Sequence, residues 1–263
     1  MRKTLFSCIT VLVAGNLLGQ QKEGKVIYER TVQVQMTIAM QGGDPTTQTV
    51  TRNNRFELNF ANNKSSWRQM EDEIQPENFG GGGGNMIVRT IGASPDDVTF
   101  CDFSLAKMVE QRSFMDKQFL IADSIKRTNT WKLSDETRTI LNHLCRKAST
   151  ERVAKRMQMS MENGQMVRKE VDDTMTVVAW FTTDIPVSVG PESPGQLPGI
   201  ILELETNRGR TKYVAQEILA KPDLSAIKEP TKGKKVTREE FAEETKKLMD
   251  EMQKNGGIRF RAS

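Results

Sequence analysis

The sequence contains only one histidine, His143, and three cysteines among its 263 residues. This scarcity excludes a metal site built from several histidines, and it excludes the HExxH motif of metalloproteases. The Gly-x-Ser-x-Gly motif of many serine hydrolases is absent as well. His143 and Cys145 are two positions apart, so on a strand they would share a face. A hydrolase or thiol enzyme that uses this pair is kept as an alternative, while we expect no catalytic site, no metal site and no cofactor.

Long apolar segments are also missing. Residues 4–18 are uncharged and mostly apolar, but a membrane-spanning helix needs about 20 such residues. They follow Arg2 and Lys3 and precede Gly19, which is the order found in a cleavable secretory signal peptide. Leu17 is large for its place before the cleavage bond. The pattern therefore predicts export more firmly than it predicts which bond is cleaved. We predict a signal peptide over residues 1–19 and an exported mature chain without a transmembrane span.

Removal of this peptide would lower a net charge that is already small. The full chain has a formal charge of +4 at pH 7, and residues 1–19 contain Arg2 and Lys3 but no acidic residue, which leaves +2. Nucleic-acid-binding proteins usually have a concentrated basic face. We therefore expect no nucleic-acid partner.

Removal would also leave two cysteines, Cys101 and Cys145, because Cys8 lies within the apolar segment. Export leads to an oxidising compartment, where a disulfide between these two cysteines can form. Two buried free thiols are an equally good interpretation, because an unpaired cysteine packs as a small apolar residue.

Alternating apolar and polar residues are the main pattern that is present. They occur over residues 32–40 and again around Phe56, Leu58 and Phe60, with turn residues at 41–45 between the two runs. This pattern predicts a long hairpin with one buried face. Further short runs of this kind are at residues 86–91, 98–103, 118–125, 130–133, 144–150, 153–161, 175–182, 200–205 and 213–218. Their density predicts an antiparallel all-β domain, and Asn163 with Gly164 is typical of a hairpin turn.

Two segments depart from the strand pattern. Residues 62–85 are polar and end in five glycines at 80–84, so we interpret them as a loop. A phosphate-binding P-loop is not indicated, because Asn85 and Met86 follow the glycines in place of Lys and Ser or Thr. Near the end of the chain, Thr237 and Glu240 form a capping box. Helical spacing then relates four side chains: Phe241, Thr245, Leu248 and Met252.

We therefore expect a mainly β protein. A single antiparallel, curved sheet or half-barrel would occupy residues 20–230. Residues 231–263 would contain a polar link and a C-terminal amphipathic helix whose apolar side packs on the sheet.

The most distinctive segment is AWFTTDIPVSVGP at residues 179–191, followed by GQLPGIILEL at 195–204. It resembles the signature of the GLPGLI family of bacterial envelope proteins, which are typical of Bacteroidota. The element that gives the family its name corresponds to Gln196-Leu197-Pro198-Gly199-Ile200-Ile201. Residues 24–29, 131–133, 140–148 and 236–241 are similar to the family in the same order. The resemblance implies a β-rich protein of the periplasm or cell envelope, with no settled activity and an association with outer-membrane transport systems.

Prolines and glycines predict that this segment is a rigid loop between two strands. We favour a role in folding, and we keep direct recognition of a partner as an alternative because binding residues often lie on positioned loops. The candidate binding residues are Trp180, Phe181, Pro186, Gly190, Pro191, Leu197, Pro198 and Gly199.

The function we expect is that of a non-enzymatic envelope binding or accessory protein. Its partner would be an apolar small molecule or an outer-membrane transport protein. A second alternative is copper handling, because Met157, Met159 and Met161 share one face of a strand and thioethers bind Cu(I). Methionine also fills irregular apolar cores, and we favour that role here.

Overall fold

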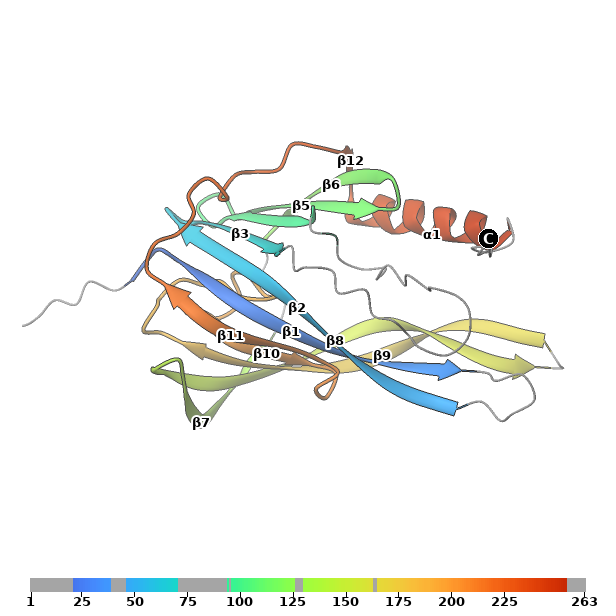
Figure 1. The fold of residues 1–263 in the computed structure, drawn as a ribbon, viewed down its shortest axis with the longest axis horizontal. Coiled ribbons are helices and arrows are strands. Elements are labelled where there is room, and N and C mark those ends of the chain that lie inside the picture. Colours follow the sequence, from blue (N-terminus) through green and yellow to red (C-terminus); the bar gives the residue numbers. More distant parts are fainter. Residues whose placement is uncertain are drawn as a thin grey trace, which may run out of the picture.

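The computed structural model describes residues 21–38, 46–70, 94, 96–125, 130–162 and 165–254. The predicted signal peptide over residues 1–19 and the glycine-rich loop at 80–84 lie outside these ranges, as does the strand expected at 86–91. Within them the chain forms one sheet and one helix (Figure 1). None of the described helical residues makes a helix long and apolar enough to cross a membrane.

The sheet has twelve strands. They are β1 Gly24–Ile38, β2 Thr46–Ala61, β3 Lys64–Gln69, β4 Val98–Asp102, β5 Lys107–Phe114, β6 Lys117–Ser124, β7 Lys132–Ile140, β8 His143–Glu162, β9 Gln165–Thr182, β10 Ile200–Thr206, β11 Thr211–Leu219 and β12 Lys234–Val236, and the helix is α1 Arg238–Lys254.

The strand order is β12-β6-β5-β4-β3-β2-β1-β11-β10-β9-β8-β7, so β12 and β7 are the two edges and the sheet is open. Every pair of neighbours is antiparallel except β12 with β6, which is parallel. The sheet curves strongly, so that β5, β6, β12 and α1 lie over the layer that contains β7 to β11 (Figure 1). The expected fold class, a mainly β protein with one curved sheet and a C-terminal helix, is confirmed.

Two long hairpins build much of the sheet. β1 and β2 pair from Gly24 with Phe60 to Ile38 with Thr46, as their alternation predicts. β8 and β9 pair without a break from Arg146 with Phe181 to Glu162 with Gln165. The two segments expected at 144–150 and 153–161 are thus one strand. The predicted hairpin turn at Asn163 and Gly164 lies outside the described ranges.

The sequence interpretation missed three strands. β3 lies in the segment that we expected to be a loop, β5 lies between two predicted strands, and β12 lies in the expected polar link before the helix. Ser65 and Ser66 of β3 are buried although they are polar, so the strand has no apolar alternation. Its backbone groups are satisfied by pairing with β2 on one side and β4 on the other.

The main hydrophobic core lies on β1, β2 and β8 to β11 and includes Val26, Tyr28, Phe60, Val177 and Leu204, all fully buried. A smaller cluster of Phe119, Ile121 and Val236 receives Phe241 of α1. The rings of Phe119 and Phe241 meet edge-on with their centroids 5.2 Å apart. This contact attaches the helix to β6.

The predicted capping box is present at the start of α1. The amide of Glu240 donates to Thr237 Oγ1 at 3.1 Å, and the amide of Thr237 donates to Glu240 Oε2 at 2.8 Å. Both contacts satisfy backbone donors that a helix start otherwise leaves without partners.

Candidate binding cavity

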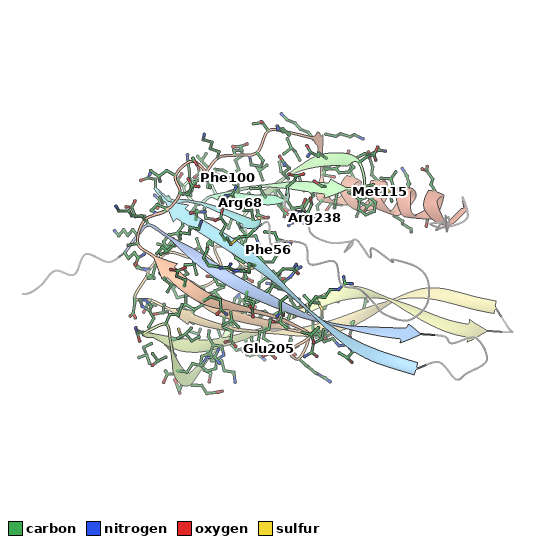
Figure 2. All side chains as sticks on the ribbon, viewed as in Figure 1. Phe56, Arg68, Phe100, Met115, Glu205 and Arg238 are labelled. Carbon is green, nitrogen blue, oxygen red and sulfur yellow. The ribbon has the colours of Figure 1, made fainter. Side chains whose placement is uncertain are left out.

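The curved sheet and α1 line a cavity of about 900 Å³ that is open to solvent on one part of its surface. Its lining residues come from β1 to β6, from β8 and β11, from the loop between β9 and β10, and from α1. Phe56 of β2 and Arg238 of α1 both line it (Figure 2). Ligand sites for small molecules have volumes of roughly 300–1,000 Å³, so this cavity is large enough for such a ligand.

One wall of the cavity is aromatic. The rings of Phe56 and Trp67 are stacked with their centroids 5.0 Å apart, and Tyr213 of β11 meets both rings edge-on at 5.9 and 5.8 Å. Phe56 and Leu58 are two apart on β2 and so share a face. The pairing of Leu58 with Trp67 brings the indole to that same face.

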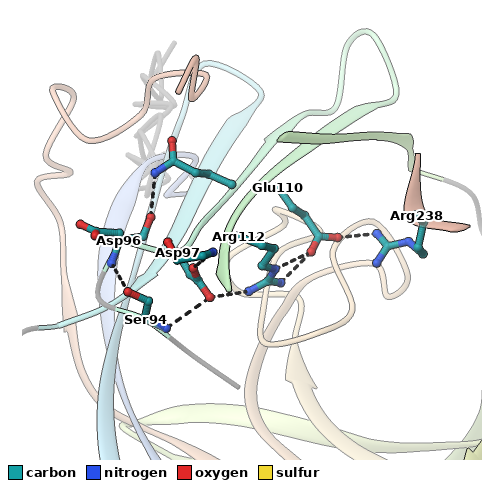
Figure 3. A network of polar contacts seen from close by, with 8 residues as sticks. Ser94, Asp96, Asp97, Glu110, Arg112 and Arg238 are labelled. Atoms are coloured by element: carbon teal, nitrogen blue, oxygen red, sulfur yellow. Dashed lines mark hydrogen bonds and ion pairs between the residues drawn. The ribbon is translucent and has the colours of Figure 1, made fainter. Parts of the chain in front are cut away.

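A second wall is charged and lies beside α1 (Figure 3). Arg112 Nη2 donates to Glu110 Oε2 at 2.6 Å and forms a longer ion pair through Nη1 with Asp97 Oδ2 at 3.8 Å. Arg238 also pairs with Glu110, and its Nε donates to Asp123 Oδ2 at 3.2 Å. The helix is therefore tied to the sheet through the buried carboxylate of Glu110 and the partly exposed carboxylate of Asp123.

The carboxylates of this wall differ in their electrostatics. Burial acts to raise the pKa of Glu110, but Arg112 and Arg238 outweigh it and hold that pKa below its usual value. For Asp97 the burial effect prevails and the pKa is raised, although the amides of Ser113 and Ser94 donate to this carboxylate. Compared with ordinary side chains of their kind, Glu110 is therefore easier to ionise and Asp97 is harder to ionise.

A third part of the lining consists of Arg30 on β1, Arg152 on β8 and the loop residues Glu192 and Ser193. The hydroxyl of Tyr213 donates to Glu192 Oε1 at 2.9 Å. Arg152 Nη2 donates to Ser193 Oγ at 2.5 Å, and its Nη1 lies 3.8 Å from Glu192 Oε2. Arg30 lies over the ring of Phe56 at 4.9 Å from the centroid.

The loop of residues 183–199, which joins β9 to β10, packs against the core. Its side chains Ile185, Val189 and Leu197 are buried there. Tyr28 donates from its hydroxyl to the carbonyl of Ile201 at 2.7 Å, and burial raises the pKa of this tyrosine. A Cβ at Gly199 would lie 2.0 Å from the carbonyl oxygen of Thr182. Only glycine allows this close approach between the loop and the end of β9.

The predicted binding residues are not gathered around the cavity. Only Gly190 lines it, and Pro186 lines a second hollow of about 460 Å³. Pro186 and Pro198 are exposed, and Trp180 is half-buried beneath Arg138, whose guanidinium lies 4.2 Å from the ring centroid. The others are buried: Phe181, Gly190, Pro191, Leu197 and Gly199. This placement favours the folding role of the segment.

Cys101 and Cys145 are buried free thiols on β4 and β8, and six strands of the sheet lie between them. The structure therefore has the two unpaired thiols and not the disulfide. Burial raises the pKa of Cys101 to about 12 and that of Cys145 to about 11. Neither thiol is a ready nucleophile at neutral pH, because only the thiolate attacks.

The arrangement of His143 does not activate Cys145. Its Nδ1 lies 3.1 Å from Asp184 Oδ2, in an exposed position. The Sγ of Cys145 donates to the backbone carbonyl of His143, at 3.5 Å, and not to its imidazole. Geometry and the raised thiol pKa together argue against the thiol-enzyme alternative.

Two other site expectations concern metals. Met157, Met159 and Met161 belong to β8, but their side chains lie outside what the structure describes, so copper binding there stays a prediction. Among the described residues, no three side chains of His, Cys, Asp or Glu are grouped so that they could hold a metal ion.

These features define a class: a mainly β protein with a cavity that is aromatic on one side and charged on the other. A sequence profile for the family described as "Protein of unknown function (Porph_ging)" matches residues 131–203. This segment runs from just before β7 into β10 and contains the 183–199 loop. It overlaps the motif at 179–204 on which the GLPGLI resemblance depends.

Two solved structures of PNGF-II are similar to this chain. The one in the C2 space group is 16% identical, has a TM-score of 0.46, and covers 84% of this chain and 33% of its own. The one in the P21 space group is 15% identical, has a TM-score of 0.49, and covers 86% of this chain and 33% of its own. This chain thus spans about a third of the length of PNGF-II. No curated protein matches its sequence.

The residues that line the cavity were missed by the sequence interpretation for an identifiable reason. Trp67 lies in the polar segment that we expected to be a loop, and Arg30 and Arg152 lie outside the alternating runs that predicted strands. The pairing of β3 with β2 and the fold of the loop over β11 bring them together. Neither relationship is local in the sequence.

Proposed function

We propose that this protein is a non-enzymatic binding protein that holds a small, largely apolar molecule in the cavity between the sheet and α1. The observation that carries the proposal is the aromatic wall of Phe56, Trp67 and Tyr213 in a cavity of about 900 Å³. Aromatic rings contribute large apolar contact areas and prefer specific stacked or edge-on geometries. A planar or chain-like apolar ligand would gain affinity from contact with all three rings.

The chemistry of the remaining lining supports binding over catalysis. Glu110, Arg112 and Arg238 are engaged with one another in ion pairs that fix α1. A general base or nucleophile needs a free and suitably perturbed group within reach of a substrate. The polar groups of the cavity are better suited to orienting a ligand than to attacking it.

The setting we propose is the cell envelope, after export, as a relative of the GLPGLI proteins. This rests on the signal-peptide pattern of residues 1–19 and the motif at 179–204. Fractionation of cells that express the full chain, with mass spectrometry of its N-terminus, tests it. A protein that begins near Gln20 in the envelope fraction supports export, and an uncleaved cytoplasmic chain contradicts it. An outer-membrane transport partner stays a prediction from the resemblance.

Binding in the cavity is tested with N-phenylnaphthylamine, a neutral apolar dye whose emission rises in apolar sites. We expect saturable binding to the wild-type protein. Thr99 of β4 lies opposite Trp67 of β3 and lines the cavity, so Thr99→Phe should fill the space beside the indole. Binding should weaken about tenfold or more, since each 1.4 kcal/mol is a factor of ten in affinity.

The matched control is Thr139→Phe, the same substitution at an exposed site on the edge strand β7. This variant should bind the dye as the wild-type protein does. Equal binding by all three proteins, or no binding by the wild-type protein, would contradict the proposed site. Far-ultraviolet circular dichroism and urea unfolding of each variant establish that it is folded.

A further inference from the structure

The arginines that line the cavity differ in how many carboxylates neutralise them. Arg112 and Arg238 share three carboxylates: Asp97, Glu110 and Asp123. Among the described residues, Arg30 and Arg152 have one carboxylate partner between them, Glu192, which pairs with Arg152. The cavity therefore has an excess of positive charge where Arg30, Arg152 and Glu192 meet the aromatic wall.

Arg30 has no carboxylate partner among the described residues. Its Nη2 donates to the neutral side chain of Asn54 at 2.8 Å, and its guanidinium lies over Phe56. The Nε of Arg30 is buried and has no hydrogen-bond partner in the described part of the chain. Guanidinium groups are strong multiple donors that match carboxylate and phosphate geometry, so the Arg30 side chain, which lines the cavity, is suited to an anion.

Arg152, which also lines the cavity, likewise has a buried Nε without a partner among the described residues. Its Nη atoms contact Ser193 and Glu192, while its Nε is buried without a hydrogen-bond partner among the residues that the structure places. Buried polar groups in native proteins are nearly always satisfied, and an exception calls for a specific explanation. Arg30 and Arg152 thus both line the cavity with donor groups that the described residues leave partly unsatisfied.

Tyr213 links this positive end to the aromatic wall. It contacts the rings of Phe56 and Trp67, and its hydroxyl donates to Glu192, the carboxylate beside Arg152. If a ligand placed an anionic group next to Phe56 and Tyr213, the rest of the same molecule would lie along Trp67 and would have to be apolar. The arginines and the aromatic rings thus line one and the same cavity.

We infer that the ligand is an amphipathic anion, in which a carboxylate or phosphate group binds between Arg30 and Arg152 and an apolar body lies against Phe56, Trp67 and Tyr213. This inference rests on the proposed function, because it names the chemical class of the molecule that occupies the same cavity.

The test uses two dyes with the same aromatic body. Anilinonaphthalene sulfonate carries an anionic group that N-phenylnaphthylamine lacks. At low ionic strength the anionic dye should bind the wild-type protein about tenfold tighter or more, as expected for charge-assisted hydrogen bonds. Arg30→Gln and Arg152→Gln should each remove most of this preference while leaving the affinity for the neutral dye within about twofold.

The control is Arg138→Gln, which also removes an arginine that lies over an aromatic ring, in this case Trp180 on β9. Arg138 does not line the cavity, so this variant should keep the preference for the anionic dye. If the wild-type protein binds the neutral dye but shows no preference for the anionic one, the inference fails and the proposed cavity stands. If neither dye binds, both fail.

Displacement experiments separate the chemical sources of the anion. Decanoate, decyl phosphate and decanol are each titrated against the bound anionic dye. Displacement by either anion at concentrations about tenfold lower than decanol supports the inference and identifies the preferred headgroup. Equal displacement by decanol overturns it, because the apolar chain alone would then account for binding.

Discussion

Arg238 and Glu110 join the helix to the sheet: the guanidinium of the first residue of α1 donates a hydrogen bond to a carboxylate within β5. The same carboxylate accepts two hydrogen bonds from Arg112. Glu110 is nearly buried, whereas Arg238 is half exposed. The position of α1 over the cavity therefore depends on a shielded acid and on Phe241, which packs on Phe119.

Replacement of Glu110 with Gln should destabilise the protein by about 1–2 kcal/mol. Charged hydrogen bonds contribute roughly 1.5–3 kcal/mol, and the exposure of Arg238 lowers this value through solvent screening. Urea unfolding measures the change. Glu239→Gln, at an exposed neighbour of Arg238 in the first turn of α1, should leave the free energy of unfolding almost unchanged. Equal losses in the two variants would contradict the assigned role of Glu110.

The contribution of Glu110 should disappear in acid. Its pKa is lower in the folded protein than in the unfolded chain, where an ordinary glutamate has a pKa of about 4.3. The stabilisation is therefore complete above the unfolded pKa and is lost as the pH falls toward the folded value. The difference in unfolding free energy between wild type and Glu110→Gln should be constant from about pH 5 to 7 and shrink below about pH 4.

Asp97 does not obscure this measurement. Burial raises the pKa of Asp97, so ionisation of this residue destabilises the folded protein, whereas ionisation of Glu110 stabilises it. Because Asp97 is present in both proteins, its titration contributes similarly to each and largely cancels in the difference. A difference that stays constant down to about pH 2 would contradict the prediction for Glu110.

Adjacent residues of the 183–199 loop should respond very differently to truncation. Leu197 is buried in the main core, so Leu197→Ala should cost about 2–5 kcal/mol by loss of apolar contact and creation of a cavity. Pro198 is exposed, so Pro198→Ala should cost within about 1 kcal/mol, mainly through the entropy of the unfolded chain. Thermal and urea unfolding measure both. A stable Leu197→Ala variant would contradict the folding role of the loop.

The two cysteines should be countable as thiols without any reductant. Unfolded, unreduced mature protein should yield two thiols in a colorimetric thiol assay, and the native protein should react slowly, because Cys101 and Cys145 are buried and their pKa values are raised. Cys145→Ser should lower the count to one. A count near zero in the unfolded wild-type protein would show that the cysteines are paired or otherwise oxidised.

Part of this fold follows directly from the sequence. The alternation around Phe56, Leu58 and Phe60 predicted β2, and the spacing of Thr237 and Glu240 predicted the start of α1, because both patterns are local. β3 could not be found in this way, since its buried Ser65 and Ser66 are stabilised by the strands on either side.

The cavity was harder to predict than the sheet. Arg30, Trp67, Arg152 and Arg238 belong to four different elements, and no spacing in the sequence relates them. The 183–199 loop was identified correctly as a defined connection, but Ile185, Val189 and Leu197 are buried in the core, and only some of its residues reach the cavity. Long-range strand pairing, and not local pattern, determines which side chains meet.

The pairing of β1 with β11 has a consequence for how the chain folds. Tyr28 of β1 donates to the carbonyl of Ile201, 173 positions further along, and β1 forms its second ladder with β11 near the other end of the chain. Contacts of such high sequence separation slow folding, because the entropy of closing a long loop is lost before the contacts form. The edge of β1 that pairs with β11 therefore stays unpaired until nearly all of the remaining chain is available to complete the sheet.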